Sequence, residues 1–210
     1  VVGTQAYHYP SKEAEQKKGF HPFGAALNEP VAKINSGDFR VLSAVYSAGS
    51  LWATLGTEIT DDNGDQQMGA AYFAFRPRIE DGKLSARVVT QGVVSETGAN
   101  LLRPAIAVNA ENRGAMVFTL VGSNDFPSSA FVPIRAGTAG PIQISRAGNE
   151  PEDGFTGYRA FGSNGTARWG DYSAAAVDAD GSIWMATEYT PDLPRTLFAN
   201  WSTYITRYRP

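Results

Sequence analysis

The sequence contains no cysteine, and this absence excludes several kinds of chemistry. Disulfides, thiolate metal sites and cysteine nucleophiles all need that side chain. Histidine is scarce as well, because His8 and His21 are the only two and both lie near the N-terminus. A Ser-His-Asp triad or a multi-histidine zinc site therefore has almost nothing to be built from.

Basic charge and long hydrophobic runs are missing too. The chain has 18 lysines and arginines against 21 aspartates and glutamates, a net charge of −3, and no basic run longer than Lys17-Lys18. We therefore expect no nucleic-acid groove, which would need a basic face. No apolar stretch reaches the ~20 residues that a membrane-spanning helix needs. With 42% apolar residues among 210, the chain can still bury a core.

What the sequence does contain is a hairpin that occurs three times. Each copy has a short apolar strand, a polar turn with a glycine, and a second strand that ends in threonine. Alternating apolar positions around turns rich in Asn, Asp and Gly are typical of β-hairpins. The copies are "AVYSAGSLWAT" (44–54), "AVNAENRGAMVFT" (107–119) and "AVDADGSIWMAT" (176–187), and their turn glycines Gly49, Gly114 and Gly181 are 65 and 67 residues apart.

More strand-like sequence follows each hairpin, so units one and two each contain four predicted strands and unit three contains three. Repeated four-stranded antiparallel units predict an all-β protein built as a β-propeller, with a self-contained two-sheet β-sandwich as the alternative. The predicted organisation is an N-terminal segment (1–35) followed by three blades within 36–210, at about 36–97, 98–150 and 165–210.

The N-terminal segment holds the one stretch with good helical features. In "SKEAEQKKG" (11–19), Ser11 is a candidate cap, Glu13 and Lys17 are four residues apart, and Gly19 ends the pattern. We predict a short surface helix there. The stretch "PVAKIN" (30–35) is a candidate outer strand of a blade.

Three blades are too few for a closed propeller, which has typically 4–8. An open set of three would expose apolar faces at both ends. The chain also begins at Val1 instead of methionine. We therefore expect a proteolytically processed chain that works in a hetero-complex, its ring being completed by a second chain of the same precursor or by another subunit.

Three motifs in the second half of the chain resemble those of a known family. They are "NDFPSSAF" (124–131), "RWGDYSAAAVDADGSIWMATEY" (168–189) and "NWSTYITRY" (200–208). Here the chain is similar to the C-terminal part of secreted bacterial β-propellers with a sialidase-like fold. The resemblance implies that fold and a location in the periplasm, at the cell surface or outside the cell.

The loop "ARWGDY" (167–172) holds the candidate ligand-binding residues, because loops that lead into innermost propeller strands open on the channel mouth. Unit one has a near-match, "SGDFR" (36–40), so a structural reading competes for the shared Gly-Asp-aromatic piece. Arg168 and Trp169 have no counterpart there. An arginine beside an indole can bind a carboxylate or stack on a sugar. With Glu188, at the end of the same hairpin, they form the predicted ligand site.

The same region offers an enzymatic alternative. A sialidase-type glycoside hydrolase uses a Tyr–Glu pair, an acid and a cluster of arginines that holds the substrate carboxylate. Asp171, Tyr172 and Glu188 are of the right types for the catalytic roles. Their order differs from that of the enzyme class, and we therefore keep a non-enzymatic protein- or glycan-binding module as the first hypothesis and a hydrolase fragment as the second.

One acidic loop is a candidate calcium site. In "TDDNGDQQ" (60–67), the residues Asp61, Asn63 and Asp65 alternate, and oxygen ligands at that spacing can surround a hard cation. The glycine does not stand where an EF-hand loop needs it, so an ordinary acidic turn between two strands is the competing interpretation. No other cofactor is expected.

Overall fold

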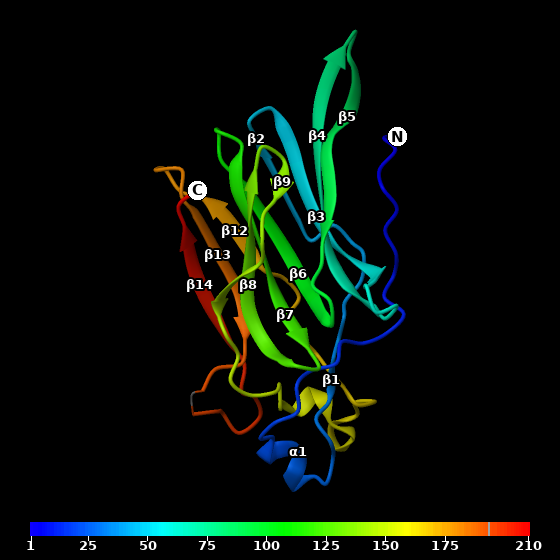
Figure 1. Cartoon of the computed structure of the whole chain (residues 1–210), viewed down its shortest axis with the longest axis vertical. Coiled ribbons are helices and arrows are strands. Elements are labelled where there is room, and N and C mark those ends of the chain that lie inside the picture. The colour runs from blue at the N-terminus through cyan, green and yellow to red at the C-terminus, as the bar shows by residue number, and fades with distance from the viewer. Residues whose placement is uncertain (193) are drawn as a thin grey trace.

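The computed structural model describes residues 1–192 and 194–210, and they fold into three antiparallel sheets (Figure 1). Sheet 1 is a meander of four strands, and sheet 2 continues the chain in the same way. Sheet 3 has three strands in the order β12-β13-β14. Sheet 1 consists of β2 (Ser43–Ser47), β3 (Ser50–Thr60), β4 (Gln66–Glu80) and β5 (Lys83–Val94); sheet 2 of β6 (Ala99–Val108), β7 (Arg113–Gly122), β8 (Asp125–Arg135), β9 (Thr138–Ala139) and β10 (Gln143–Arg146); sheet 3 of β12 (Ala174–Val177), β13 (Ile183–Tyr189) and β14 (Ser202–Tyr208).

The all-β prediction is confirmed, and the sheets stack face to face, which is compatible with the predicted propeller and with the sandwich alternative. Sheet 2 is the middle layer, and its strands present apolar side chains on both faces because neighbouring residues point to opposite sides. Ile106 and Met116 face sheet 1, where they join Trp52 in one core cluster. Ala107 and Val117 face sheet 3 and pack in a second cluster that includes its β13 strand. The innermost strands β2, β6 and β12 lie next to one another in the stack.

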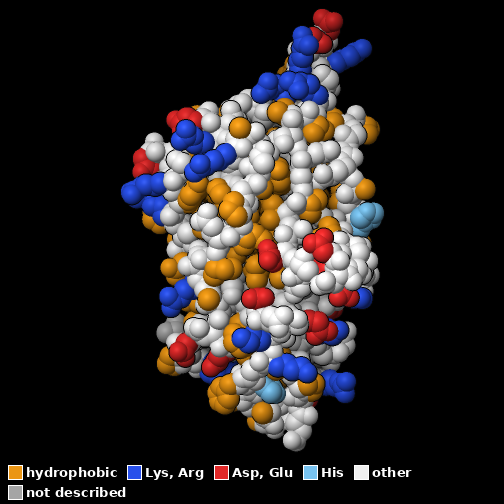
Figure 2. Space-filling model, viewed as in Figure 1, with side chains coloured by type: hydrophobic (Ala, Val, Ile, Leu, Met, Phe, Trp, Pro, Cys, Tyr) orange, Lys and Arg blue, Asp and Glu red, His pale blue; other side chains and the backbone are white. Residues whose placement is uncertain are grey.

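The opposite ends of the molecule differ in character. The β4–β5 hairpin is paired as far as Glu80 and Lys83, whereas β3 pairs with β4 only as far as Phe75, so the hairpin projects beyond the stack (Figure 1). Figure 2 shows lysine and arginine side chains gathered on this projection. The other end is a base made of irregular segments, with helix α1 (Pro22–Ala26), strands β1 (Lys33–Ile34) and β11 (Thr166–Ala167), and the single 3-10 turns η1 (Phe155–Gly157) and η2 (Arg159–Phe161).

The helix predicted at residues 11–19 is wrong. Ala14 makes two backbone hydrogen bonds to Ile34 and is buried in a cluster with Trp169. The side chain of Gln16 is also buried and donates to two backbone carbonyl groups. A polar helix this short is marginal in water, and these tertiary contacts stabilise the extended form instead.

The candidate outer strand at 30–35 lies elsewhere than on an outer edge. Its central part, β1, pairs in parallel with β11, the segment that leads into sheet 3. Among the described residues, no helix is long and apolar enough to cross a membrane.

Candidate functional site

The candidate site is a pocket of about 360 Å³ near the N-terminal ends of β2, β6 and β12, the first strands of the three sheets. Each of the three repeated units contributes one arginine to its wall. Arg40 precedes β2, Arg103 belongs to β6, and Arg168 lies in the loop before β12. The other lining residues are Tyr9, Asn35, Gly37, Asp38, Leu42, Asp171 and Tyr172.

Arg103 is the anchored member of the three arginines. Its Nε donates to the carbonyl oxygen of Gly170 at 2.7 Å, and its Nη2 donates to Asn35 and Trp169. Burial lowers the pKa of this guanidinium, while the nearby charges of Asp171 and Asp38 act in the opposite direction. Its Nη1 makes no hydrogen bond within the part of the chain that the structure describes, and it therefore keeps a donor for a ligand.

The backbone at Arg103 is strained, and the neighbouring chain makes room for the side chain. Its φ of 53° lies in the left-handed region, which costs a non-glycine residue free energy, and β6 carries a bulge at this point. A side chain at Gly37 would collide with the guanidinium, so the loop before β2 can pass so closely only because it has glycine there. Strain of this kind persists where the surrounding structure fixes it, and functional sites are one such place.

The other two arginines are exposed and able to move toward a ligand. Arg40 pairs with Asp38 at 2.6 Å, and Arg168 is 3.5 Å from Asp171. The side chains of Arg40 and Arg168 are 79% and 77% exposed, so water surrounds both guanidinium groups and weakens their ion pairs. Three arginines against two aspartates leave the pocket with one net positive charge.

The structure separates the predicted ligand residues into three environments. Arg168 lines the pocket. Trp169 is buried in a core cluster that includes residues of sheets 1 and 2, and its indole N–H donates to Thr119 of β7, so it cannot stack on a sugar. Glu188 lies behind the loop rather than in the pocket wall, directly against Gly170, where a Cβ atom would meet its carboxylate. Burial raises the pKa of Glu188, an effect that the Gly170 backbone N–H and the charge of Arg103 partly offset.

The residues of the enzymatic alternative are close together without forming a catalytic pair. Asp171 and Tyr172 line the pocket, and Tyr172 is 70% exposed. Its hydroxyl makes no hydrogen bond to any residue in the described ranges, Glu188 included. A tyrosine nucleophile needs an adjacent base within hydrogen-bond reach, and the geometry at Tyr172 does not supply one.

Two of the three arginines were missed in the sequence, although a signal was present. Counting back four residues from the first alanine of each repeated hairpin (Ala44, Ala107, Ala176) leads to Arg40, Arg103 and Tyr172. All three line the pocket. The repeat therefore marks one pocket-lining position, four residues before the first alanine of each repeated hairpin.

The candidate calcium loop forms the β3–β4 turn. Asp61 Oδ1 accepts backbone N–H groups of Asn63 and Asp65 at 2.9 Å, and its Oδ2 accepts that of Gly98 at 3.1 Å. These bonds, that from Asp65 most, lower the pKa of Asp61. Within residues 1–192 and 194–210, no three His, Cys, Asp or Glu side chains are grouped so that they could hold a metal ion. The Asp61 carboxylate is thus engaged in closing the turn.

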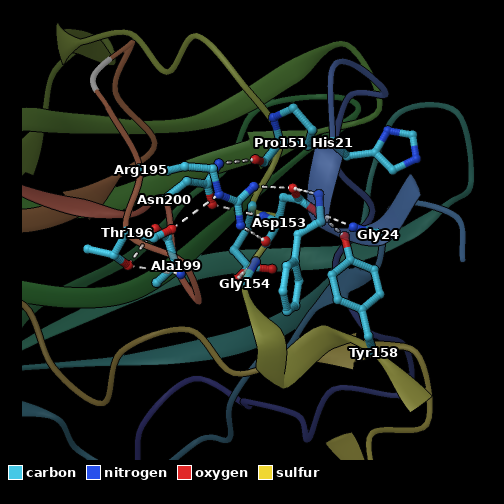
Figure 3. Close-up of polar contacts among 12 residues, drawn as sticks. His21, Gly24, Pro151, Asp153, Gly154, Tyr158, Arg195, Thr196, Ala199 and Asn200 are labelled. Carbon is cyan, nitrogen blue, oxygen red and sulfur yellow. Dashed lines mark hydrogen bonds and ion pairs between the residues drawn. The ribbon is translucent and has the colours of Figure 1, made fainter. Parts of the chain in front are cut away.

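A second polar cluster lies buried in the base (Figure 3). Asp153, fully buried, accepts the backbone N–H groups of Phe23 and Gly24, the hydroxyl of Tyr158 and the guanidinium of Arg195. These contacts join helix α1, the turn η1 and the loop before β14. The cluster is closed to solvent around Asp153, and we assign it a structural role.

A scan against protein-family models and a search of curated proteins both return no match for this chain.

Proposed function

We propose that this chain is a non-enzymatic binding module of a secreted or surface-exposed β-propeller, and that its pocket binds a carboxylate-bearing glycan. The observation that carries the proposal is the meeting of Arg40, Arg103 and Arg168, one from each repeated unit, around one pocket. Guanidinium groups bind carboxylates through paired, charge-assisted hydrogen bonds. Tyr172 beside them offers an exposed ring for a sugar face.

The wider setting of the module is also part of the proposal. Three sheets that stack as blades fall short of a closed propeller, and the ring would be completed by another polypeptide or subunit. The resemblance of residues 124–131, 168–189 and 200–208 to sialidase-like propellers supports a location outside the cytoplasm.

Binding can be tested by calorimetric titration with N-acetylneuraminic acid, glucuronic acid and the methyl ester of each. We expect the acids to bind and the uncharged esters to bind at least ~10-fold more weakly, because the carboxylate supplies the charge-assisted bonds. Arg168→Ala and Arg40→Ala should each weaken binding of the acid about 10-fold.

Arg78→Ala is the matched control, since Arg78 is an exposed arginine on the projecting hairpin, outside the pocket. Equal affinity of acid and ester, or equal losses in all three variants, would contradict the proposal.

A sialidase-type hydrolase is the second candidate, because Asp171 and Tyr172 line the same pocket as the arginines. Release of a fluorescent aglycone from an α-linked sialoside measures this activity directly. Turnover that Tyr172→Phe abolishes would favour the hydrolase. Binding of the acid without turnover would favour the module.

A further inference from the structure

In each repeated hairpin, the residues two and three positions after the turn glycine point to opposite faces of the sheet. The same positions can therefore be compared among the three sheets. Three residues after the turn glycine stand Trp52, Val117 and Trp184. Trp52 faces sheet 2 and is 2% exposed, and Val117 faces sheet 3 and is 1% exposed. Trp184 is at the same place on the outer face of sheet 3, which no other sheet of the described residues covers, and it is 41% exposed.

The opposite faces show the complementary pattern. Two residues after the turn glycine stand Leu51, Met116 and Ile183. Met116 packs against sheet 1 and Ile183 against sheet 2, and both are 0% exposed. Leu51 is at the same place on the outer face of sheet 1 and is 40% exposed, beside Tyr46 at 64%. The outer faces of sheet 1 and sheet 3 therefore correspond to the two sides of the interface that joins neighbouring sheets within the chain, but neither face is covered by another sheet of the described residues.

The outer face of sheet 3 can be covered without burying an unpaired charge at its centre. Ala186 and Ile205 are paired across β13 and β14 and both point outward with Trp184. Arg207 lies over the Trp184 ring at 5.2 Å, and its guanidinium is held by Asp180 at 2.5 Å. Trp184 also donates to Asp178, so its indole N–H is satisfied.

The part of the outer face of sheet 1 that would meet a partner sheet is exposed. The N-terminal segment covers the part around Phe73, on which the ring of Tyr7 packs edge-on. Tyr46 on β2 and Leu51 on β3 stay exposed.

We infer that a second copy of this chain is the partner that completes the stack: sheet 3 of each copy packs on sheet 1 of the other, as sheet 1 packs on sheet 2 within the chain. Two copies contribute six sheets, a number within the 4–8 of closed propellers, and a two-fold axis closes the ring. This inference rests on the proposed propeller setting, and it names a homodimer in place of the hetero-complex expected from the sequence.

Sedimentation equilibrium of the chain from 1 to 100 µM tests the pairing. We expect mostly single chains at 1 µM and a species of twice the 22.5 kDa of one chain at 100 µM. Trp184→Glu and Leu51→Glu should each raise the dissociation constant at least ~10-fold, because each places a charge in both interfaces of the ring. Phe20→Glu is the control, since Phe20 is an apolar side chain at the base that is exposed even more than Trp184 and Leu51. Circular dichroism confirms that each variant is folded.

Mixing the two variants gives the sharpest outcome. Trp184→Glu keeps an intact sheet 1 and Leu51→Glu keeps an intact sheet 3, so the mixture should recover one of the two interfaces and associate more strongly than either variant alone. A dimer that Leu51→Glu leaves intact, or no gain on mixing, would overturn the head-to-tail arrangement. A monomer at 100 µM would overturn the inference and leave the face of Trp184 to a different polypeptide. Titration of the same monomer with N-acetylneuraminic acid reports the proposed binding function separately.

Discussion

At the scale of single residues, Glu152 is the titratable group whose environment is most unusual. It is 1% exposed, its Oε1 accepts the backbone N–H of Gly154 at 2.8 Å, and its Oε2 has no hydrogen-bond partner in the described chain. Burial raises its pKa to about 8, the neighbouring Asp153 acts in the same direction, and Arg195 acts against it. Glu152 is therefore a neutral acid at neutral pH, held beside the cluster that joins the base to the sheets.

This raised pKa predicts that the protein is less stable in mild alkali. In the unfolded chain Glu152 loses its proton near pH 4.5, and in the folded chain near pH 8. The free energy of unfolding should therefore fall as the pH rises from 4.5 to 8, because the unfolded state releases the proton first, and level off above. The loss attributable to Glu152 is about 2–5 kcal/mol, measured by urea unfolding at pH 5 and pH 8.5.

Glu152→Gln separates this residue from all other titrating groups. Glutamine keeps an acceptor for the Gly154 N–H and has no proton to lose, so the variant should lose most of the pH dependence and be more stable than the native chain at pH 8.5. The same slope in the variant and the native chain would show that other groups cause the dependence.

At the scale of elements, the β3–β4 turn allows a structural and a metal-binding role to be separated. Asp61→Ala removes the acceptor of three backbone N–H groups and should lower the melting temperature in calcium-free buffer. Asp65→Ala is the matched control, because Asp65 contributes to this turn through its backbone groups. If the two variants differ in this way and calcium leaves the native melting temperature unchanged, Asp61 acts as a turn cap. A calcium-dependent rise that Asp65→Ala abolishes would favour the predicted metal site.

The sequence allowed the strands of the repeats to be predicted but not the segments outside them. Hairpins such as 44–54 can be predicted because alternating apolar residues and turn residues are local features of the sequence, and the folded chain keeps the local structure that they favour. The predicted helix at 11–19 failed because Ala14 and Gln16 gain more from contacts with residues far along the chain than from local hydrogen bonds. The pocket was predicted only in part, because it also depends on contacts between distant segments. Arg168 was predicted, but Arg103 lies beside it only because sheets 2 and 3 stack.

At the scale of the whole molecule, truncating an apolar side chain should cost most stability between two sheets and least on the exposed outer face of sheet 1. Met116, Ile183 and Leu51 hold equivalent positions, but only the first two are covered by a neighbouring sheet. Met116→Ala and Ile183→Ala should each lower the free energy of unfolding by ~2–5 kcal/mol, because each leaves a cavity between two sheets. Leu51→Ala should cost less than ~1 kcal/mol at 1 µM, where copies of the chain are mostly apart.

The same three variants also test the pairing of copies from the side of stability. At 100 µM the second copy would cover Leu51, so Leu51→Ala should become more costly as the concentration rises, because a partner that binds only the folded state stabilises it by mass action. The costs of Met116→Ala and Ile183→Ala arise within one chain and should depend far less on concentration. Urea unfolding of each variant at both concentrations measures the difference. A cost of Leu51→Ala that stays below ~1 kcal/mol at both would contradict burial of this residue by a second copy.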